Sequence, residues 1–351
     1  MTTDTPALTA EKLQRFLARR RPNATTVAVR DVVPLTGGYS CVTVRFTAEI
    51  DGEPVQLVAR QDAPAETVVQ KTDRVREWRV LEALTRQGGV PMPAALHADE
   101  DGSELGAPTI VLELAEGGSF LAKVRGGDEA TQRECALQMA DLAAALHATD
   151  VSALPQDVER PQDWDEYVVA LAADWRAMEE RLSDSYPMIR YMAAWLEANR
   201  PAPAPLGLVH GEFQPSNQVL DGDGGLQAID WEFVHVGDPR EDLGWCQWCE
   251  SVQPPVLIGM DPEAFCARYR QKSGLGEDVI NPLTLAYFSI LPAVKVFGNV
   301  LDVQQAFADG EASGFRTAFL VGAVATAFEG WFGATAQIER AASAGRSEVA
   351  A

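Results

Sequence analysis

The sequence predicts an α+β protein with two lobes, a small β-rich N-terminal lobe and a larger, mainly helical C-terminal lobe. Short segments rich in β-branched residues fill most of residues 1–115, with one helical segment embedded among them. Apolar residues at helical spacing prevail over residues 116–340, and the small, polar residues 341–351 are typical of a flexible tail. A length of 351 residues is long for one compact core and suits two lobes.

The N-terminal lobe is expected to form a sheet accompanied by helices. Its first helix, at residues 9–20, places Leu13, Phe16 and Leu17 on one face. Turn signals separate the segments that follow, as Asp51-Gly52 does between two β-rich runs. In chain order, the expected elements after this helix are strands at 26–33, 41–46 and 55–60, a helix at 71–87, and strands at 95–97 and 108–114.

Beyond residues 115–118 the periodicity becomes helical. A stiff Pro/Ala connector at 201–205 interrupts the helices and leads towards two short strands. These strands, 219–220 and 226–229, are joined by a Gly/Asp-rich turn and are expected to form a hairpin. The expected helices cover residues 131–149, 164–182 and 188–197, and the helical pattern resumes from residue 262.

The charge balance argues against some partners. Acidic residues number 51 and basic residues 29, a formal net charge of −22. Nucleic acid and anionic membranes are therefore not expected as partners, because both bind basic surfaces. An acidic surface could attract a cationic substrate such as an aminoglycoside, although a protein kept soluble by self-repulsion explains the same charge.

Cysteine usage and apolar run length indicate a cytoplasmic protein. The five cysteines give no disulfide framework, and an odd number fits a reducing compartment. The first residues lack the charged and apolar regions of a signal peptide. The longest uncharged runs, at 279–294 and 317–328, fall short of the roughly 18–20 apolar residues that span a bilayer.

The residues that carry chemistry lie around the predicted hairpin. A short apolar strand runs into a tight turn that carries Glu212, and Asn217 stands five residues further on. Asp230 ends the next apolar strand. A hairpin brings the ends of its arms together, and Mg²⁺ favours an amide and carboxylate pair completed by phosphate and water. This order predicts a site that holds Mg-ATP and uses Glu212 to orient an acceptor hydroxyl for phosphoryl transfer.

Each of these residues also has an alternative explanation. Asn217 could cap a turn and Asp230 could cap a helix, although their spacing from Glu212 favours the metal site. Kinase-type catalytic loops almost always carry Asp at the position of Glu212. The extra methylene of Glu212 moves its carboxylate by ~1.5 Å. Misplacement on that scale costs on the order of 10²-fold in rate. Either the pocket is drawn back to suit Glu212, or the protein binds nucleotide without efficient transfer.

The N-terminal lobe contains a candidate phosphate site. Gly37 and Gly38 lie between two predicted strands, where backbone N–H groups could approach phosphates and Ser40 could add a hydroxyl. A plain turn explains the two glycines as well. Arg60 ends the third predicted strand and Glu77 lies on the helix that follows, so the two side chains could pair while Arg60 clamps the α- and β-phosphates.

Other polar residues are interpreted as structural. Asp238 and Asp242 lie where a turn enters a helix and are expected to organise the loop and the hairpin. Cys246 and Cys249 form a C-x-x-C pair on that helix, but no second Cys/His pair stands at zinc spacing, so core packing is expected. His210 is expected to pack beneath the loop and to fix its backbone.

Together these residues resemble the aminoglycoside phosphotransferase-like family, small-molecule kinases related to choline kinases. The resemblance runs from about residue 32 to residue 247, and its most specific part is His-Gly-x-x-x-x-x-Asn, Ile-Asp-Trp-Glu and Gly-Asp-Pro-x-x-Asp-Leu. It implies a bilobal protein-kinase-like fold, ATP or GTP as the phosphoryl donor, and Mg²⁺. The segment from Glu113 to Ala115 would be the hinge that hydrogen-bonds the adenine.

The resemblance also implies roles for the site residues. Asn217 and Asp230 would bind Mg²⁺, and Glu212 stands at the position of the family's catalytic Asp. Arg60, paired with Glu77, stands where the family more usually has a phosphate-clamping lysine, and this departure could alter the phosphate contact.

The sequence thus predicts a cytoplasmic kinase that transfers the γ-phosphoryl group to a hydroxyl of a small metabolite or xenobiotic. The acceptor is expected in the helical lobe, facing Glu212. The family includes antibiotic, amino-alcohol and sugar-alcohol kinases, so the resemblance does not identify the acceptor. A nucleotide-binding pseudokinase and a purely structural two-lobe protein remain as alternatives, and the oligomeric state is not predicted.

Overall fold

The computed structural model describes residues 8–35, 41–63, 73–182, 187–252, 255–291, 310, 329–340 and 343. The chain forms two compact units: unit 1 is Met1–Gly118, Ala153–Pro155 and Leu220–Phe233, and unit 2 is Ser119–Ser152, Gln156–Val219 and Val234–Ala351. The predicted lobe boundary at residue 115 stays a prediction. Gly37, Gly38, Ser40 and nearly all of the expected tail lie outside the described residues.

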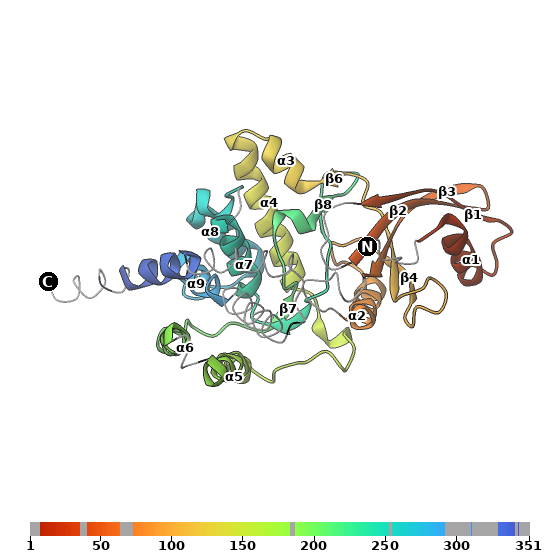
Figure 1. Ribbon diagram of the computed structural model, residues 1–351. Helices are drawn as coiled ribbons and strands as arrows, with labels where there is room; N and C mark the ends of the chain where they lie inside the picture. Colours follow the sequence, from red (N-terminus) through yellow and green to blue (C-terminus); the bar gives the residue numbers. More distant parts are fainter. Residues whose placement is uncertain are drawn as a thin grey trace. The chain divides into compact units, whose positions relative to one another are not determined.

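Unit 1 is built on an antiparallel sheet in the order β1-β2-β3-β5-β4, with α1 packed against β1 (Figure 1). The predicted turn joins β2 and β3, and its residues Asp51 and Gly52 have φ angles of 53° and 90°. Such left-handed conformations match a two-residue turn to the twist of its strands. The elements are α1 (Ala10–Arg20), β1 (Val27–Leu35), β2 (Cys41–Ile50), β3 (Glu53–Asp62), α2 (Arg74–Gln87), β4 (Ala95–Asp99) and β5 (Thr109–Glu113).

The core of unit 1 lies between α1 and the sheet. Leu13, Phe16 and Leu17 are buried as the helical spacing predicts, in one cluster with Phe46 and Leu57 of the strands. Each such side chain contributes about 1.5–3 kcal/mol on burial. This core holds β3 in place at the centre of the sheet, and β3 carries Arg60.

Unit 2 is mainly helical. Its helices pack in pairs, α4 with α8, α7 with α9 and α5 with α6. β7 and β10 form a two-stranded antiparallel sheet in which Val209 pairs with His235. The elements of unit 2 are α3 (Phe120–Gly126), α4 (Glu129–His147), α5 (Trp164–Leu182), α6 (Pro187–Ala198), β7 (Gly207–Val209), η2 (Pro215–Asn217), β10 (His235–Gly237), α7 (Arg240–Val252), η3 (Ile258–Met260), α8 (Pro262–Ser273) and α9 (Pro282–Phe288).

The predicted hairpin is present. Its strands are β8 (Gln218–Leu220) and β9 (Leu226–Ala228), which belong to a small sheet of order β6-β8-β9, where β6 is Gly118–Ser119. Asp221 closes the turn, because its N–H donates to the carbonyl of Gly225 at 2.9 Å and its Oδ1 accepts from the N–H of Gly225 at 2.7 Å. The segment Leu220–Phe233, expected in the helical lobe, belongs to unit 1.

These elements confirm the predicted α+β class, with a sheet near the N-terminus and a helical remainder. Over the described residues, no helix combines the length and the apolar character that a membrane span needs.

Candidate active site

Arg60 and Glu77 form the ion pair that their order in the sequence suggests. Arg60 lies opposite Thr43 of β2 and Ile110 of β5, and its Nη1 is 2.6 Å from Oε1 of Glu77 on α2. The two side chains are only 8% and 1% exposed. Burial would lower the pKa of Arg60, but the carboxylates of Asp230 and Glu77 outweigh it and raise the pKa well above its usual value. Arg60 is therefore a permanent cation held inside the sheet.

Arg74 is a second buried cation beside this pair. It is one turn before Glu77 on α2 and forms an ion pair with that carboxylate, while its Nε donates to Oδ1 of Asp62 at 3.1 Å. Asp62 is the last residue of β3. Burial raises the pKa of Asp62, and Arg74 opposes that shift. Arg74 thus fastens the start of α2 to the end of β3.

The segment after β9 adds two carboxylates to these cations. Asp230 forms an ion pair with Nη2 of Arg60. Glu232 Oε2 lies 3.8 Å from Nη2 of Arg60 and 3.9 Å from Nη2 of Arg74. We call the whole group in unit 1 the buried charge cluster; it consists of Arg60, Asp62, Arg74, Glu77, Asp230 and Glu232.

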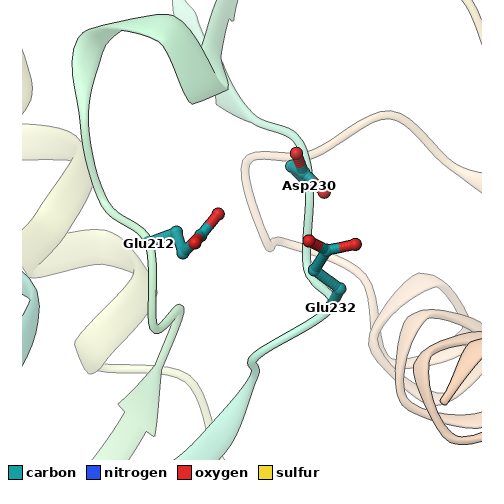
Figure 2. A group of neighbouring side chains, drawn as sticks. All are labelled: Glu212, Asp230 and Glu232. Carbon is teal, nitrogen blue, oxygen red and sulfur yellow. The ribbon is translucent and has the colours of Figure 1, made fainter. Parts of the chain in front are cut away.

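Asp230 has a backbone conformation that is rare for a residue with a side chain. Its φ angle is 70°, in the left-handed region. Such strain persists only where the surrounding structure holds it, and it is common at functional sites. Figure 2 shows Asp230 and Glu232 on the stretch that follows β9, and each offers a carboxylate oxygen within 4.8 Å of one from the other. Glu212, also drawn there, lies on the loop that follows β7.

In unit 2, Asp242 holds the backbone of the Glu212 loop. Its Oδ2 accepts from the N–H of His210 at 2.8 Å and its Oδ1 from the N–H of Gly211 at 2.9 Å. His147 Nε2 lies 3.1 Å from the same carboxylate, and its Nδ1 is 2.8 Å from the hydroxyl of Tyr269. Burial alone would raise the pKa of Asp242, but its hydrogen bond and charge interactions with His147 outweigh burial and lower it. The organising role expected for Asp242 is confirmed by these contacts.

Glu212 and Asn217 are linked through the loop itself. Asn217 Nδ2 donates to the backbone carbonyl of Glu212 at 3.0 Å, and the N–H of Glu212 donates to Nδ1 of His210 at 3.3 Å. His210 is fully buried, as expected for a residue beneath the loop. Gly211 has a φ angle of 89°, which lets the chain turn sharply just before Glu212. The carboxylate of Glu212 therefore extends from a fixed backbone.

Asp238 anchors the start of α7. Its Oδ2 accepts from Nη2 of Arg240 at 2.7 Å and from Nε1 of Trp164 at 2.8 Å. Neither Asp238 nor Arg240 is exposed to solvent. Because α7 also carries Asp242, this pair fixes the helix that positions the Glu212 loop.

Cys249 of α7 lies within electrostatic reach of Glu212. Burial raises the pKa of its thiol, and the charges of Glu212 and Glu250 raise it further. Cys246 and Cys249 both carry free thiols, and Cys246 is fully buried, in line with the packing role expected for it.

The predicted hinge follows β5. The N–H of Glu113 donates to the carbonyl of Ala94 at 3.0 Å, and that of Leu114 donates to Gln56 at 3.1 Å. The side chain of Glu113 is exposed and Ala115 is partly buried. The adenine contact assigned to Glu113 and Ala115 stays a prediction.

Sequence reasoning missed three members of the buried charge cluster. Glu232 ends the Ile-Asp-Trp-Glu motif, two residues after Asp230, but the motif alone assigned no chemical role to it. Arg74 had a local signal, since a spacing of three residues places it beside Glu77 on a helix. Asp62 had none, because its pairing depends on the junction between β3 and α2.

The sheet, the helical remainder and the organised Glu212 loop define a kinase-like phosphotransferase. The family model described as "Phosphotransferase enzyme family" matches residues 31–272, more than half of the chain. The chain therefore belongs to this phosphotransferase family, which confirms the family that the motifs resemble, and it is a small-molecule kinase in its general class.

Comparisons with solved structures confirm the fold. A protein assigned to the aminoglycoside phosphotransferases from Ralstonia eutropha JMP134 has a TM-score of 0.65 at 21% identity, covering 94% of this chain and 99% of that one. Aminoglycoside phosphotransferase APH(4)-Ia, in a complex with ADP and hygromycin B, has a TM-score of 0.56 at 17% identity, covering 91% and 98%. Macrolide 2'-phosphotransferase MphH from Brachybacterium faecium has a TM-score of 0.58 at 18% identity, covering 90% and 97%.

Two curated relatives are much longer than this chain. "Acyl-CoA dehydrogenase family member 10" of Mus musculus is 29% identical over 198 residues, which are 54% of this chain and 18% of the relative. "Probable acyl-CoA dehydrogenase IBR3" of Arabidopsis thaliana is 27% identical over 223 residues, which are 59% of this chain and 27% of the relative. The matched segments thus amount to about a quarter or less of the length of each relative.

Proposed function

We propose that this protein is an Mg²⁺-dependent kinase that transfers the γ-phosphoryl group of ATP, or of GTP, to a hydroxyl of a small molecule. The observation that carries the proposal is the Arg60–Glu77 pair with Asp230 attached to it. The pair sets a cation at the centre of the nucleotide-lobe sheet and joins it to the expected metal ligand. Membership of the phosphotransferase family supports the same reaction class.

The buried charge cluster suits a divalent cation. It contains two guanidinium groups and four carboxylates, which leaves two formal negative charges without a counter-charge inside the cluster. We propose that Asp230 and Asn217 bind Mg²⁺, with Glu232 beside Asp230 as a further carboxylate. Mg²⁺ prefers oxygen ligands and, when bound, neutralises the phosphate charge of the nucleotide.

Arg60 would contact the phosphates while Glu77 holds it in place. A guanidinium presents several N–H donors in one plane and can bind phosphate oxygens in pairs. In the present arrangement its Nη2 pairs with Asp230, so nucleotide binding would exchange that carboxylate for phosphate. The glycine turn with Gly37, Gly38 and Ser40 would cover the phosphates with backbone N–H groups.

Glu212 would accept or orient the proton of the acceptor hydroxyl. Its backbone is fixed on both sides, by Asp242 through Gly211 and by Asn217 through the carbonyl of Glu212. Because the backbone is fixed, the longer side chain of Glu212 places its carboxylate at a defined position. The rest of the active site can then hold the acceptor at the matching distance. This supports an active enzyme over a nucleotide-binding pseudokinase.

The nucleotide base and the acceptor complete the proposal. The N–H groups of Glu113 and Leu114 already donate within unit 1, so we propose that the N–H of Ala115 bonds the adenine. The acceptor is a hydroxylated small molecule that binds in the helical unit beside Glu212. A cytoplasmic location stays a prediction from the sequence.

A phosphorus NMR assay tests this function. The protein is incubated with Mg-ATP or Mg-GTP and a pool of aminoglycosides, amino alcohols and sugar alcohols. We expect a new phosphomonoester signal that needs both Mg²⁺ and one pool member. Nucleotide binding without any such signal across a broad pool would favour the pseudokinase, and the absence of nucleotide binding would reject both.

A further inference from the structure

A series of hydrogen bonds within unit 2 connects helix α8 to the Glu212 loop. The hydroxyl of Tyr269 on α8 lies 2.8 Å from Nδ1 of His147, the last residue of α4. Nε2 of the same ring lies 3.1 Å from Oδ2 of Asp242 on α7. Asp242 in turn accepts from the two backbone N–H groups that precede Glu212. We call the side chains of Tyr269, His147 and Asp242 the Tyr269 network.

Every side chain of the Tyr269 network is buried. Tyr269 and Asp242 are 0% exposed, and the side chain of His147 is 4% exposed. The rings of Tyr269 and His147 also meet edge to face, with their centroids 5.7 Å apart. Bulk water therefore does not compete for these bonds, and loss of one partner would leave a buried polar atom unsatisfied.

The charge of Asp242 sets the direction of its bond with His147. Burial alone would raise the pKa of this carboxyl group, but its hydrogen bond with His147 and its other partners outweigh burial and lower the pKa. Asp242 is therefore ionised, and an ionised carboxylate only accepts hydrogen bonds. Nε2 of His147 must then carry a proton.

The bond between Tyr269 and His147 has a direction as well. Burial raises the pKa of Tyr269, and the charges of Asp238 and Asp242 add to the shift, so the hydroxyl keeps its proton. A buried hydroxyl proton needs an acceptor, and over the described residues its one hydrogen-bond partner is Nδ1 of His147. Tyr269 therefore donates, and Nδ1 of His147 is unprotonated.

Helix α8 is fastened to α4, which keeps the two rings in register. The helices pack together (Figure 1), and Arg268, next to Tyr269, contacts both carboxylate oxygens of Asp141 on α4 at 2.6 and 2.7 Å. β7 approaches the end of α4 closely, because a Cβ at Gly207 would lie 2.9 Å from the carbonyl oxygen of His147. The end of α4 thus contacts both α8 and the strand that leads into the loop.

We propose that Tyr269 is a positioning residue for phosphoryl transfer: its hydroxyl orients the ring of His147, and that ring holds Asp242 where it accepts from both N–H groups before Glu212. Tyr269 has no exposed surface, so it acts through His147 and not by touching a substrate. The effect on transfer rests on the proposed function, whereas the network itself is measured without nucleotide.

Imidazole ¹⁵N NMR of the nucleotide-free full chain at neutral pH tests the network. His147→Leu identifies the signals of this ring among the four histidines. We expect a protonated Nε2 and an unprotonated, hydrogen-bonded Nδ1. Tyr269→Phe should move the Nδ1 signal to that of a ring nitrogen without a hydrogen bond. A proton on Nδ1, or an Nδ1 signal that Tyr269→Phe leaves unchanged, would overturn the proposal.

Tyr287→Phe is the matched control. Tyr287 is also buried in unit 2, and its hydroxyl donates to the carbonyl of Leu196 at 3.1 Å, so the variant loses the same kind of bond. Hydrogen exchange of the Gly211 N–H, corrected for global stability by urea unfolding, should be roughly 2- to 10-fold faster in Tyr269→Phe than in the control. Equal exchange would overturn the proposal, and this measurement needs no histidine variant.

Kinetics test the effect on transfer. Tyr269→Phe should lower kcat roughly 2- to 10-fold and leave KM for Mg-ATP within about twofold, and Tyr287→Phe should change neither by more than about twofold. In a His147→Leu background, Tyr269→Phe should have no further effect, because it acts through that ring. Additive losses would overturn the proposal. If the unmodified chain transfers no phosphoryl group, the proposed function fails, and NMR and exchange still decide whether Tyr269 positions the loop.

Discussion

Arg60 of β3 is bonded to Asp230, a residue 170 positions further along the chain. The first was expected to contact phosphate and the second Mg²⁺, and in unit 1 each serves as the counter-charge of the other. Arg60 therefore pairs with the carboxylate that Mg²⁺ would need as a ligand. We expect nucleotide and Mg²⁺ to bind cooperatively, because phosphate that attracts Arg60 also releases Asp230.

Asp230→Ala should remove the metal dependence of nucleotide affinity. Without this carboxylate, titration calorimetry should give the same weak affinity for ATP in Mg²⁺ and in EDTA. Asp223→Ala, in the exposed turn of the same hairpin, is the control and should behave like the unmodified chain. If Asp230→Ala kept a strong Mg²⁺ dependence, the metal assignment would be wrong.

Arg74→Met should destabilise the fold strongly. Its side chain and that of Glu77 are each 1% exposed, and removing one partner of a buried pair costs about 3–5 kcal/mol. The loss in the free energy of unfolding should lie near the lower end of this range, because Glu77 still pairs with Arg60. Arg86→Met removes an exposed pair on the same helix, 71% and 45% exposed, and should cost at most about 0.5 kcal/mol. Urea unfolding measures both, and equal losses would contradict a central structural role for Arg74.

Asp242→Asn should impair the loop and change the acid response of the protein. An amide can accept from only one of the two backbone N–H groups without presenting its NH₂ to the other, so kcat should fall on the order of 10²-fold. The folded pKa of Asp242 is lowered, so its stabilisation is complete above its ordinary value and is lost as pH falls through the folded value. Urea unfolding between pH 7 and pH 2.5 should therefore show a weaker acid dependence in the variant. If the variant and the unmodified chain had the same dependence of stability on pH, a group other than Asp242 would cause the acid response.

His97 should titrate far below an ordinary histidine. Burial, then the charges of Arg21 and Arg20, lowers its pKa to about 4. The unfolded chain protonates first, so this residue costs stability as pH falls from about 6.5 to about 4 and costs nothing above that range. The chain has four histidines, so NMR can resolve the titration. Arg21→Gln should raise the pKa of His97, and a pKa near 6.5 in the unmodified chain would contradict its burial.

The local parts of the fold could be predicted and the distant pairings only in part. The turn at Asp51-Gly52 and the apolar face of α1 follow from residue type and spacing, and both are present. Arg60 and Glu77 were expected to pair because they lie on consecutive elements. The attachment of Asp230 to Arg60 joins segments far apart in the chain, so no local pattern indicates it.

The site was predictable where a motif fixes the order of its residues. The Glu212 loop and its support by Asp242 could be placed because the motif spans a short stretch of chain. The hydrogen bond from Trp164 of α5 to Asp238 could not be foreseen, because the partners of a buried side chain depend on how whole helices pack.

The central claim is that Glu212 takes part in phosphoryl transfer. Single-turnover transfer from Mg-ATP to an acceptor found in the pool tests it, comparing the unmodified chain with Glu212→Gln and Glu212→Asp. We predict transfer by the unmodified chain and a loss on the order of 10²- to 10⁴-fold in Glu212→Gln, with nucleotide affinity within about twofold. Equal rates in the unmodified chain and Glu212→Gln would contradict the claim, and so would a silent unmodified chain that gains activity as Glu212→Asp.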